Sequence, residues 1–288
     1  MKKVIIFLIA VVFSVTAYAE SSVWKLNSDI NGNFYIAGSC HVLSKSDYPL
    51  PDEFESAYVN VDRVIFETDL EALMSPEIQF LMVRNGTYTG NDTLEKKLSK
   101  KAYATIAKYC NDNAIPIDIL QKLKPWMVAL SLLFFELEKI GVTPADGLEM
   151  YFNEKAKKDG KNTGGLEDVK EHVKYVTSME EELDEAIIES FAKEIEELHV
   201  MMKDIIKSWK AGDEAGLIEY LSESLRNDFP KLHKRIIIDR NRNWISPIED
   251  LINSGKRTLV VVGVGHLVGE KSVINLLSSK GYKIEKLQ

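Results

Sequence analysis

Two Gly-x-x-His motifs, one near each end of the chain, constrain the fold more than any other feature of the sequence. The first, Gly38-Ser39-Cys40-His41, follows a β-type run at residues 33–37, and the second, Gly263-Val264-Gly265-His266, follows an apolar run at residues 257–262. Ligand sites in open α/β sheets gather at the carboxyl ends of strands, and glycine lets the backbone turn sharply there. If the two strands are neighbours, His41 and His266 meet at the same edge of a sheet.

The residues around the two motifs repeat one order of elements. Each motif is followed by a predicted helix and then by a predicted strand. The helices are expected near Pro51 and at residues 271–279, and the strands at residues 63–67 and 282–287. The turn dipeptide Asn31-Gly32 predicts that the first motif's strand pairs as a hairpin with residues 23–26. We therefore predict an α/β fold (α+β) with two pseudo-symmetric strand–Gly-x-x-His–helix–strand halves that form a central sheet region.

The middle of the chain, residues 93–253, is predicted to be helical from its apolar periodicity. Within it, residues 181–209 carry apolar side chains at steps of three and four, which give one long amphipathic face. Trp126, which follows Pro125, is expected to fill the core. The sequence contains no Gly/Ser-rich linker. We expect residues 20–288 to form a single domain in which the helical middle is a large insertion that covers the sheet.

The segment at residues 1–19 differs from the rest of the chain. Lys2 and Lys3 precede an apolar run at residues 4–15, and Ala17-Tyr18-Ala19 follows it. This pattern is typical of a secretory signal peptide that is cleaved after Ala19. A run of about a dozen apolar residues is shorter than the roughly twenty that cross a bilayer. The protein is thus expected to be periplasmic or secreted, with no integral membrane span after cleavage.

The charge balance disfavours nucleic acid as a partner. The chain has 44 acidic residues against 36 lysines and arginines, a formal net charge of −8. Such a surface repels phosphate on average. The two cysteines, Cys40 and Cys110, are too few for a four-thiolate zinc site. They pair in an oxidising compartment only if their Cα atoms come within about 7 Å, and the sequence leaves this open.

A third candidate ligand stands at the end of the next predicted strand. Glu67 closes the run at residues 63–67, directly after the first motif's helix. Two imidazoles and one carboxylate, here His41, His266 and Glu67, are a common open ligand set for Zn, Mn, Fe or Co. The alternative is that each histidine only makes local hydrogen bonds. The other histidines lie on helical stretches and are expected to be surface or partly buried residues with no role: His172, His199 and His233.

Three acidic residues and one arginine are candidates for further chemistry. If Glu67 is a metal ligand, the general base is expected to be Glu149 or Glu167; otherwise Glu67 itself is the base. Arg240 is a candidate fixed cation for an anionic group or a developing oxyanion. Its alternative is a salt bridge to Asp239 or Glu249. Asn241 is expected either to orient Arg240 or to lie in the site.

We reject the hypothesis that the second motif binds a dinucleotide. Gly263-Val264-Gly265 with Gly269 resembles a phosphate-binding turn, which requires an acidic residue about twenty positions further on, after another strand of a βαβ unit. Only nineteen residues follow Gly269, and the next predicted strand ends the chain. The two-histidine site therefore remains the leading hypothesis.

Seven motifs in a fixed order resemble the TraB/GumN family, which includes the bacterial pheromone-shutdown proteins and the animal Tiki extracellular proteases. They are GSCH (38–41), DRVIFETD (62–69), LKPW (123–126), GLEMYF (147–152), GGLED (164–168), DRNRNW (239–244) and VVVGVGHLVGEKSV (260–273). The resemblance covers residues 23–287. It implies two pseudo-symmetric α/β halves, distantly similar to erythromycin esterase and ChaN-like proteins. In one motif, Gly147-Leu148-Glu149 stands where the family is expected to have Gly-Val-Asp.

The resemblance also implies an activity. It points to a metal-dependent hydrolase, and more narrowly to a peptidase that cleaves a peptide or an exported protein, with His41, Glu67 and His266 at a divalent ion such as Mn, Co or Zn. Two other function classes stay open. One is a metal-independent, esterase-like hydrolase in which His41 activates water with the help of Glu67. The other is a non-catalytic protein that sequesters a peptide or a cofactor.

Overall fold

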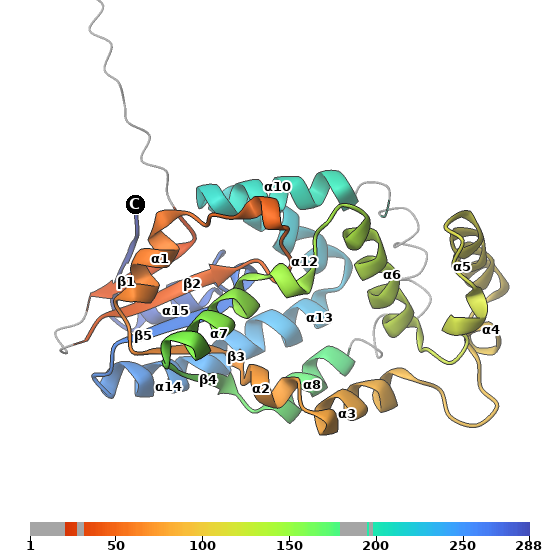
Figure 1. The fold of residues 1–288 in the computed structure, drawn as a ribbon, viewed down its shortest axis with the longest axis horizontal. Helices are drawn as coiled ribbons and strands as arrows, with labels where there is room; N and C mark the ends of the chain where they lie inside the picture. Colours follow the sequence, from red (N-terminus) through yellow and green to blue (C-terminus); the bar gives the residue numbers. More distant parts are fainter. Residues whose placement is uncertain (1–20, 28–31, 179–194, 196–197) are drawn as a thin grey trace, which may run out of the picture.

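The computed structural model describes residues 21–27, 32–178, 195 and 198–288 (Figure 1). The predicted signal peptide at residues 1–19 lies outside these residues, as does most of the first half of the helix predicted at residues 181–209. Within the described residues, the chain forms a six-stranded mixed sheet and a large helical part. In this part of the chain, every helix is too short or too polar to cross a bilayer.

The sheet has the strand order β4-β3-β5-β2-β1-β6. Its strands are β1 (Val23–Asn27), β2 (Phe34–Ser39), β3 (Arg63–Thr68), β4 (Asn162–Glu167), β5 (Thr258–Gly263) and β6 (Lys283–Lys286). The strands β4, β3, β5 and β2 are parallel, whereas β1 is antiparallel to both of its neighbours. The predicted hairpin of β1 with β2 is confirmed.

The strands that carry the two Gly-x-x-His motifs are direct neighbours. Gly38 of β2 pairs with Val262 of β5, and Ser39 pairs with Gly263. Each strand is followed by a helix and then by another strand of the same direction, so that β2 leads to β3 and β5 leads to β6. The predicted order of elements in the two halves is therefore confirmed, and both histidines come to the same edge of the sheet.

Helices cover both faces of the sheet. On one face, Leu259 and Val261 of β5 pack in a cluster with α1 (Asp52–Val59), α7 (Leu148–Asp159) and α10 (Leu198–Ala211). On the other face, Val260 and Val262 pack with α14 (Arg240–Asn253) and α15 (Val273–Ser279). Successive side chains of a strand point to opposite faces, and a strand covered on both faces is apolar throughout. This explains the continuous apolar sequence of β5.

A group of helices lies beyond the end of the sheet, at the far right of Figure 1. It has a core of its own, in which α4 (Leu94–Lys97) and α5 (Lys100–Asp112) pack against the first half of α6 (Pro125–Lys139). Trp126 at the start of α6 is 2% exposed, as expected for a core residue. The other α-helices of the described residues are α2 (Leu70–Leu73), α3 (Pro76–Gly86), α8 (Val169–Thr177), α11 (Glu214–Leu217), α12 (Ser224–Asp228) and α13 (Pro230–His233).

Several helical segments depart from α geometry. Among the residues that the structure describes, four are single 3₁₀ turns: η1 (Lys45–Asp47), η2 (Ile117–Leu120), η3 (Pro144–Asp146) and η7 (Val264–His266). Two are π-helical: η5 (Ile218–Glu223) and η6 (Lys234–Asp239). π-Helical turns occur frequently at functional sites. Here η6 leads directly into α14, whose first residue is Arg240.

The prediction that residues 93–253 are helical throughout is wrong at β4. This strand forms the edge of the sheet and pairs in parallel with β3. Its sequence, Asn-Thr-Gly-Gly-Leu-Glu, shows no alternation of apolar residues. A Cβ at Gly165 would lie 2.6 Å from the backbone of Thr68, so close pairing of the two strands requires glycine there. The strand places Glu167 at the same edge of the sheet as Glu67.

The two cysteines are both buried and unpaired. Cys40 follows β2, whereas Cys110 lies in α5, in the separate helical group. The disulfide that the sequence left open is therefore not made in this structure.

Candidate functional site

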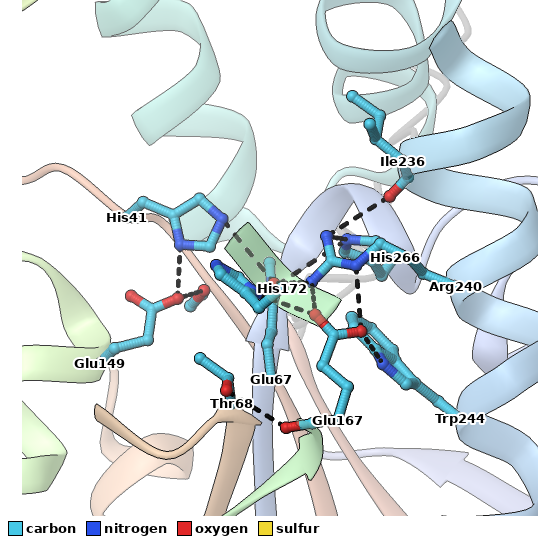
Figure 2. A network of polar contacts seen from close by, with 12 residues as sticks. His41, Glu67, Thr68, Glu149, Glu167, His172, Ile236, Arg240, Trp244 and His266 are labelled. Atoms are coloured by element: carbon cyan, nitrogen blue, oxygen red, sulfur yellow. Dashed lines mark hydrogen bonds and ion pairs between the residues drawn. The ribbon is translucent and has the colours of Figure 1, made fainter. Parts of the chain in front are cut away.

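A cluster of charged and polar side chains lies at the carboxyl ends of the parallel strands (Figure 2). His41, Glu67, Glu167 and His266 follow or end β2, β3, β4 and β5 respectively. Arg240 reaches the cluster from the start of α14. All of them except His41 have side chains that are no more than 10% exposed, whereas the ring of His41 is 62% exposed. The cluster is thus a buried ionic network with one exposed imidazole at its margin.

Glu67 is at the centre of this network. Its Oε1 atom accepts a hydrogen bond from the backbone N–H of Gly263 at 2.8 Å, and its Oε2 atom accepts one from Nη2 of Arg240 at 2.5 Å. The Nε2 atoms of His41 and His266 lie 4.0 and 3.8 Å from the same Oε1 atom. Burial opposes ionisation, but Arg240 and the imidazoles outweigh it and hold the pKa of Glu67 well below its ordinary value. Glu67 is therefore a buried carboxylate that two imidazoles face.

The orientation of His41 is set by Glu149. Nδ1 of His41 donates to Oε1 of Glu149 at 2.5 Å, and the hydroxyl of Ser39 donates to the same oxygen. Glu149 lies in the first turn of α7, where the helix dipole favours a negative charge. The charge of Glu149 raises the pKa of His41 to about 9. Because Nδ1 is used, Nε2 is the nitrogen that His41 presents to Glu67.

Asn241 orients His266 in the same way. Its side-chain amide nitrogen donates to the carbonyls of His266 and Lys271, at 3.3 and 2.9 Å, which fixes the direction of the amide. Its oxygen therefore accepts from Nδ1 of His266, at 2.6 Å. The ring of His266 also packs on Trp244, with ring centroids 4.5 Å apart. Burial lowers the pKa of His266 to about 3, so the ring is neutral and its Nε2 atom is an acceptor.

Glu167 holds the guanidinium of Arg240 in place. Its Nη2 and Nε atoms donate to the two oxygens of Glu167, at 2.7 and 3.3 Å. Trp244 donates to Glu167 through Nε1 at 2.8 Å and stacks against the guanidinium, whose central carbon is 4.7 Å from the ring centroid. The Nη1 atom lies 3.3 Å from Nε2 of His266. These contacts fix the guanidinium in one plane, between the two carboxylates and the imidazole.

The salt bridges suggested by sequence proximity are not those that Arg240 makes. Its carboxylate partners are Glu67 and Glu167. Asp239 instead pairs with Lys234 and lies 3.8 Å from Arg242, and Glu249 pairs with Lys280. Asp239 and Arg240 are consecutive on a helix, so their side chains diverge.

His172 belongs to the cluster, although the sequence analysis assigned it no role. It lies in α8, and its Nδ1 atom is 2.8 Å from Oε1 of Glu167 and 3.4 Å from Nη2 of Arg240. Its place in the cluster could not be predicted from the sequence, because its position depends on β4, which was not predicted. Glu167 ends that strand, and α8 begins just after it with Asp168 as its cap.

Two trios of side chains among the described residues are candidates for holding an ion. Two atoms bound to one ion at about 2.1 Å cannot be more than about 4.2 Å apart. The distances from Glu67 to His41 and to His266 both meet this limit. As a trio, however, these residues do not bring all their ligand atoms within 4.8 Å of one another; among the described residues, Glu67, Glu167 and His172 do.

The second trio already surrounds a cation of the protein itself. Nη2 of Arg240 lies 2.5, 2.7 and 3.4 Å from ligand atoms of Glu67, Glu167 and His172. A metal ion there would have to displace the guanidinium. In the first trio, the exposed ring of His41 is the member that has room to move. A metal ion held by His41, Glu67 and His266 would replace the single contact of Nη1 of Arg240 with Nε2 of His266, at 3.3 Å, and His41 would have to move toward His266. This donor set therefore leaves the pairs of Arg240 with Glu67 and Glu167 in place.

Cys40 and two further histidines make their contacts outside this cluster. The thiol of Cys40 donates to the carbonyl of Val42 at 3.2 Å, and burial raises its pKa to about 12. His199 lies 3.5 Å from Glu136 in the helical region, and His233 lies at the end of α13.

Comparison with known proteins agrees with the motifs of the sequence. The model of the TraB/PrgY/gumN family matches residues 22–286. A "Metalloprotease TIKI homolog" from Amphimedon queenslandica is 32% identical over 77 residues, which make up 26% of this chain and 14% of that protein. The similarity thus spans a small part of that relative. No solved structure matches the chain. The match over nearly its whole length shows that this chain belongs to the TraB/PrgY/gumN family.

Proposed function

We propose that this protein is an exported, metal-dependent hydrolase that cleaves a peptide or an exported protein, with His41, Glu67 and His266 as the ligands of a divalent ion such as Mn²⁺, Co²⁺ or Zn²⁺. One observation carries the proposal. Both histidines use Nδ1 for a hydrogen bond to a side-chain oxygen and turn Nε2 toward the same oxygen of Glu67. Metal-binding histidines are held in this way, with the second ring nitrogen donating to an oriented acceptor.

The hydrogen bonds of Glu67, Glu149 and Glu167 support a different role for each of these acidic residues. Glu67 uses both oxygens and is kept ionised by Arg240, which supports a role as ligand rather than as general base. Glu149 engages His41 and Ser39, which supports a positioning role. Glu167 is engaged by Arg240 and Trp244. None of the three is therefore proposed as the base.

Arg240 is proposed to stabilise negative charge on the substrate. Its guanidinium is fixed by Glu167 and lies beside the imidazole of His266, so it needs no rearrangement to act. A divalent ion held by this set would lower the pKa of a water molecule and polarise a substrate carbonyl. The peptide substrate and the export are supported by the family, by the name of the curated relative and by the pattern of residues 1–19.

A second candidate is a metal-independent hydrolase in which His41 is the general base. The observation that favours it is the pair formed by an exposed imidazole and a buried carboxylate, His41 and Glu149. A carboxylate that holds Nδ1 of a histidine leaves Nε2 to take a proton from water when the ring is neutral. Because Glu149 raises the pKa of His41 to about 9, this candidate predicts activity that rises toward alkaline pH. This hydrolase would keep its activity in the presence of a chelator.

Metal analysis tests the proposal. The purified protein is compared with the double variant His41→Ala/His266→Ala and with the matched control His199→Ala/His233→Ala, all after incubation with Mn²⁺, Co²⁺ and Zn²⁺. We expect about one equivalent of metal in the wild type and the control, and none in the site variant, whose fold is checked by circular dichroism. Absence of metal from the wild type would refute the metal site.

Activity is then measured with a peptide library and mass spectrometry. The metal-dependent hydrolase predicts cleavage that stops with a chelator and returns with the ion. Cleavage that continues under chelation and is lost in His41→Ala would support the second candidate instead. Stoichiometric binding of a peptide without any product would contradict both.

A further inference from the structure

A hollow separate from the histidine cluster opens beside helix α10. It has a volume of about 600 Å³, within the range of small-molecule sites, and it lies between α10, the turn η1 and the segment that follows α6. Its lining residues are Ser44, Ser46, Asp47, Ile140, Val142, Met202, Lys203, Ile206, Lys207, Lys210 and Ala211. None of them takes part in the cluster around Glu67.

The hollow combines an apolar floor with a cationic rim. Aliphatic side chains from α10 and from the segment after α6 form the floor, among them Val142, Met202 and Ile206. Lys203, Lys207 and Lys210 follow one another at steps of four and three, which places them on one side of the helix. Lysine stems lie along apolar surface while the ammonium groups stay in water.

The charge of the rim is not neutralised by its own lining. Asp47 is the acidic member of this lining, and it pairs with Lys210 at 2.9 Å, at one end of the hollow. It also accepts hydrogen bonds from Ser44, which fix its carboxylate in the turn η1. Lys203 and Lys207 are both exposed. The hollow is thus cationic on a chain whose formal net charge is −8.

We infer that this hollow binds an anionic amphiphile, a small molecule with a carboxylate or phosphate head and an aliphatic tail. The tail lies on the floor of Val142, Met202 and Ile206, and Lys203 and Lys207 bind the head. A purely polar anion would leave the apolar floor in water, and a cationic amphiphile would be repelled by the rim. The inference does not depend on the proposed hydrolase, because the two sites share no residue.

Calorimetric titration of the purified protein tests this inference. The probes each have a straight chain of twelve carbons, with the carboxyl carbon of dodecanoate included, and differ in the head: dodecanoate, dodecyl phosphate and dodecyltrimethylammonium, each below its micelle-forming concentration. We expect one molecule of an anionic probe to bind and the cationic probe not to bind. The preferred anion distinguishes a carboxylate head from a phosphate head. Equal binding of all three probes, or binding of none, would overturn the inference.

Two variants locate the binding. Lys203→Glu/Lys207→Glu removes the binding charges and is expected to weaken anion binding by about tenfold or more. Its charge-matched control is Lys256→Glu/Lys283→Glu, which changes two exposed lysines outside the hollow and should leave binding unaltered.

The second variant tests the volume rather than the charge. Ser46 is exposed and lines the hollow, so Ser46→Trp adds a large ring there without changing any lysine. This variant should reduce binding. Circular dichroism checks that each variant is folded. Unchanged affinity in both the lysine variant and Ser46→Trp would show that the amphiphile binds elsewhere, and the proposed site would then be wrong.

Discussion

The side-chain oxygen of Asn241 accepts a hydrogen bond from Nδ1 of His266 at 2.6 Å, while the amide nitrogen of Asn241 donates to the backbone carbonyls of His266 and Lys271. The two residues are 25 positions apart in the sequence and come from α14 and η7. This contact fixes the nitrogen that His266 turns toward Glu67. It also connects α14, which begins at Arg240, to the second Gly-x-x-His motif.

Replacing Asn241 by alanine should weaken metal binding and destabilise the fold. Loss of an oriented acceptor behind a metal-binding histidine costs about 10- to 100-fold in affinity or activity. The buried carbonyl of His266, left without this donor, costs about 1–3 kcal/mol. Metal titration and urea denaturation measure the two effects. Asn243→Ala, at an exposed position on the same helix, is the control and should change neither.

Glu149→Gln should lower activity by about 10- to 100-fold without unfolding the protein. The glutamine keeps the size of the side chain but removes the charge that orients His41. Activity and metal content are measured together on the variant. The control is Glu154→Gln, an exposed residue of the same helix α7. Equal activity of Glu149→Gln and the wild type would contradict the positioning role.

Glu167→Gln should be strongly destabilising, by about 3 kcal/mol, because it removes one of two carboxylates from a buried arginine. Urea denaturation gives the free energy of unfolding. Glu171→Gln changes an exposed acid on α8 and, as expected for a surface ion pair, should cost less than about 1 kcal/mol. A cost for Glu167→Gln as small as that of the control would mean that Glu167 does not hold Arg240.

Glu136 should make stability depend on pH in the acidic range. Burial raises its pKa, but the hydrogen bonds from Lys139 and Tyr109 outweigh burial and lower the pKa below 4.5. A carboxyl with a lowered folded pKa stabilises the protein above its unfolded pKa and loses this effect as the pH falls through the folded value. The difference in urea midpoint between wild type and Glu136→Gln should therefore shrink from pH 6 toward pH 3. Glu138→Gln, exposed on the same helix, should show no such trend.

Gly263→Ala should disturb the site and leave most of the fold intact. A Cβ there would lie 2.7 Å from Nε2 of His41, the exposed end of a side chain that can turn away. We expect loss of metal binding with little loss of stability. At Gly147, by contrast, a Cβ would lie 2.2 Å from the backbone oxygen of His41, which cannot turn away. Gly147→Ala should therefore lower the thermal midpoint more than Gly263→Ala does.

The sequence predicted the parts of the site that belong to apolar strands. His41, Glu67 and His266 each follow or end a strand with a clear apolar pattern, so their common edge could be inferred from the rules of parallel sheets. The positions of Glu167 and His172 in the site were harder to predict from the sequence. Glu167 ends β4, and His172 lies in α8, which begins just after it. The strand β4 is held by backbone pairing at two glycines, and such pairing leaves no hydrophobic pattern to recognise.

The partner of Arg240 could not be predicted for a related reason. Its nearest acids in the sequence, such as Asp239, lie on the same helix but point elsewhere. Its true partners, Glu67 and Glu167, reach it only once three strands and α14 have packed together. Tertiary packing therefore decides which charges meet, and the sequence alone suggests only which charges are available.

The in-register pairing of Ser39 with Gly263 constrains how the sequence of this protein can be altered in length. Side chains of a strand alternate with a period of two, so the insertion or deletion of one residue within β2 or β5 turns the following side chains to the opposite face. One such change would move one histidine about 3.3 Å along the ladder relative to the other. Loops between the elements can vary in length. In β2 and β5, by contrast, the number of residues can change only if both strands change together.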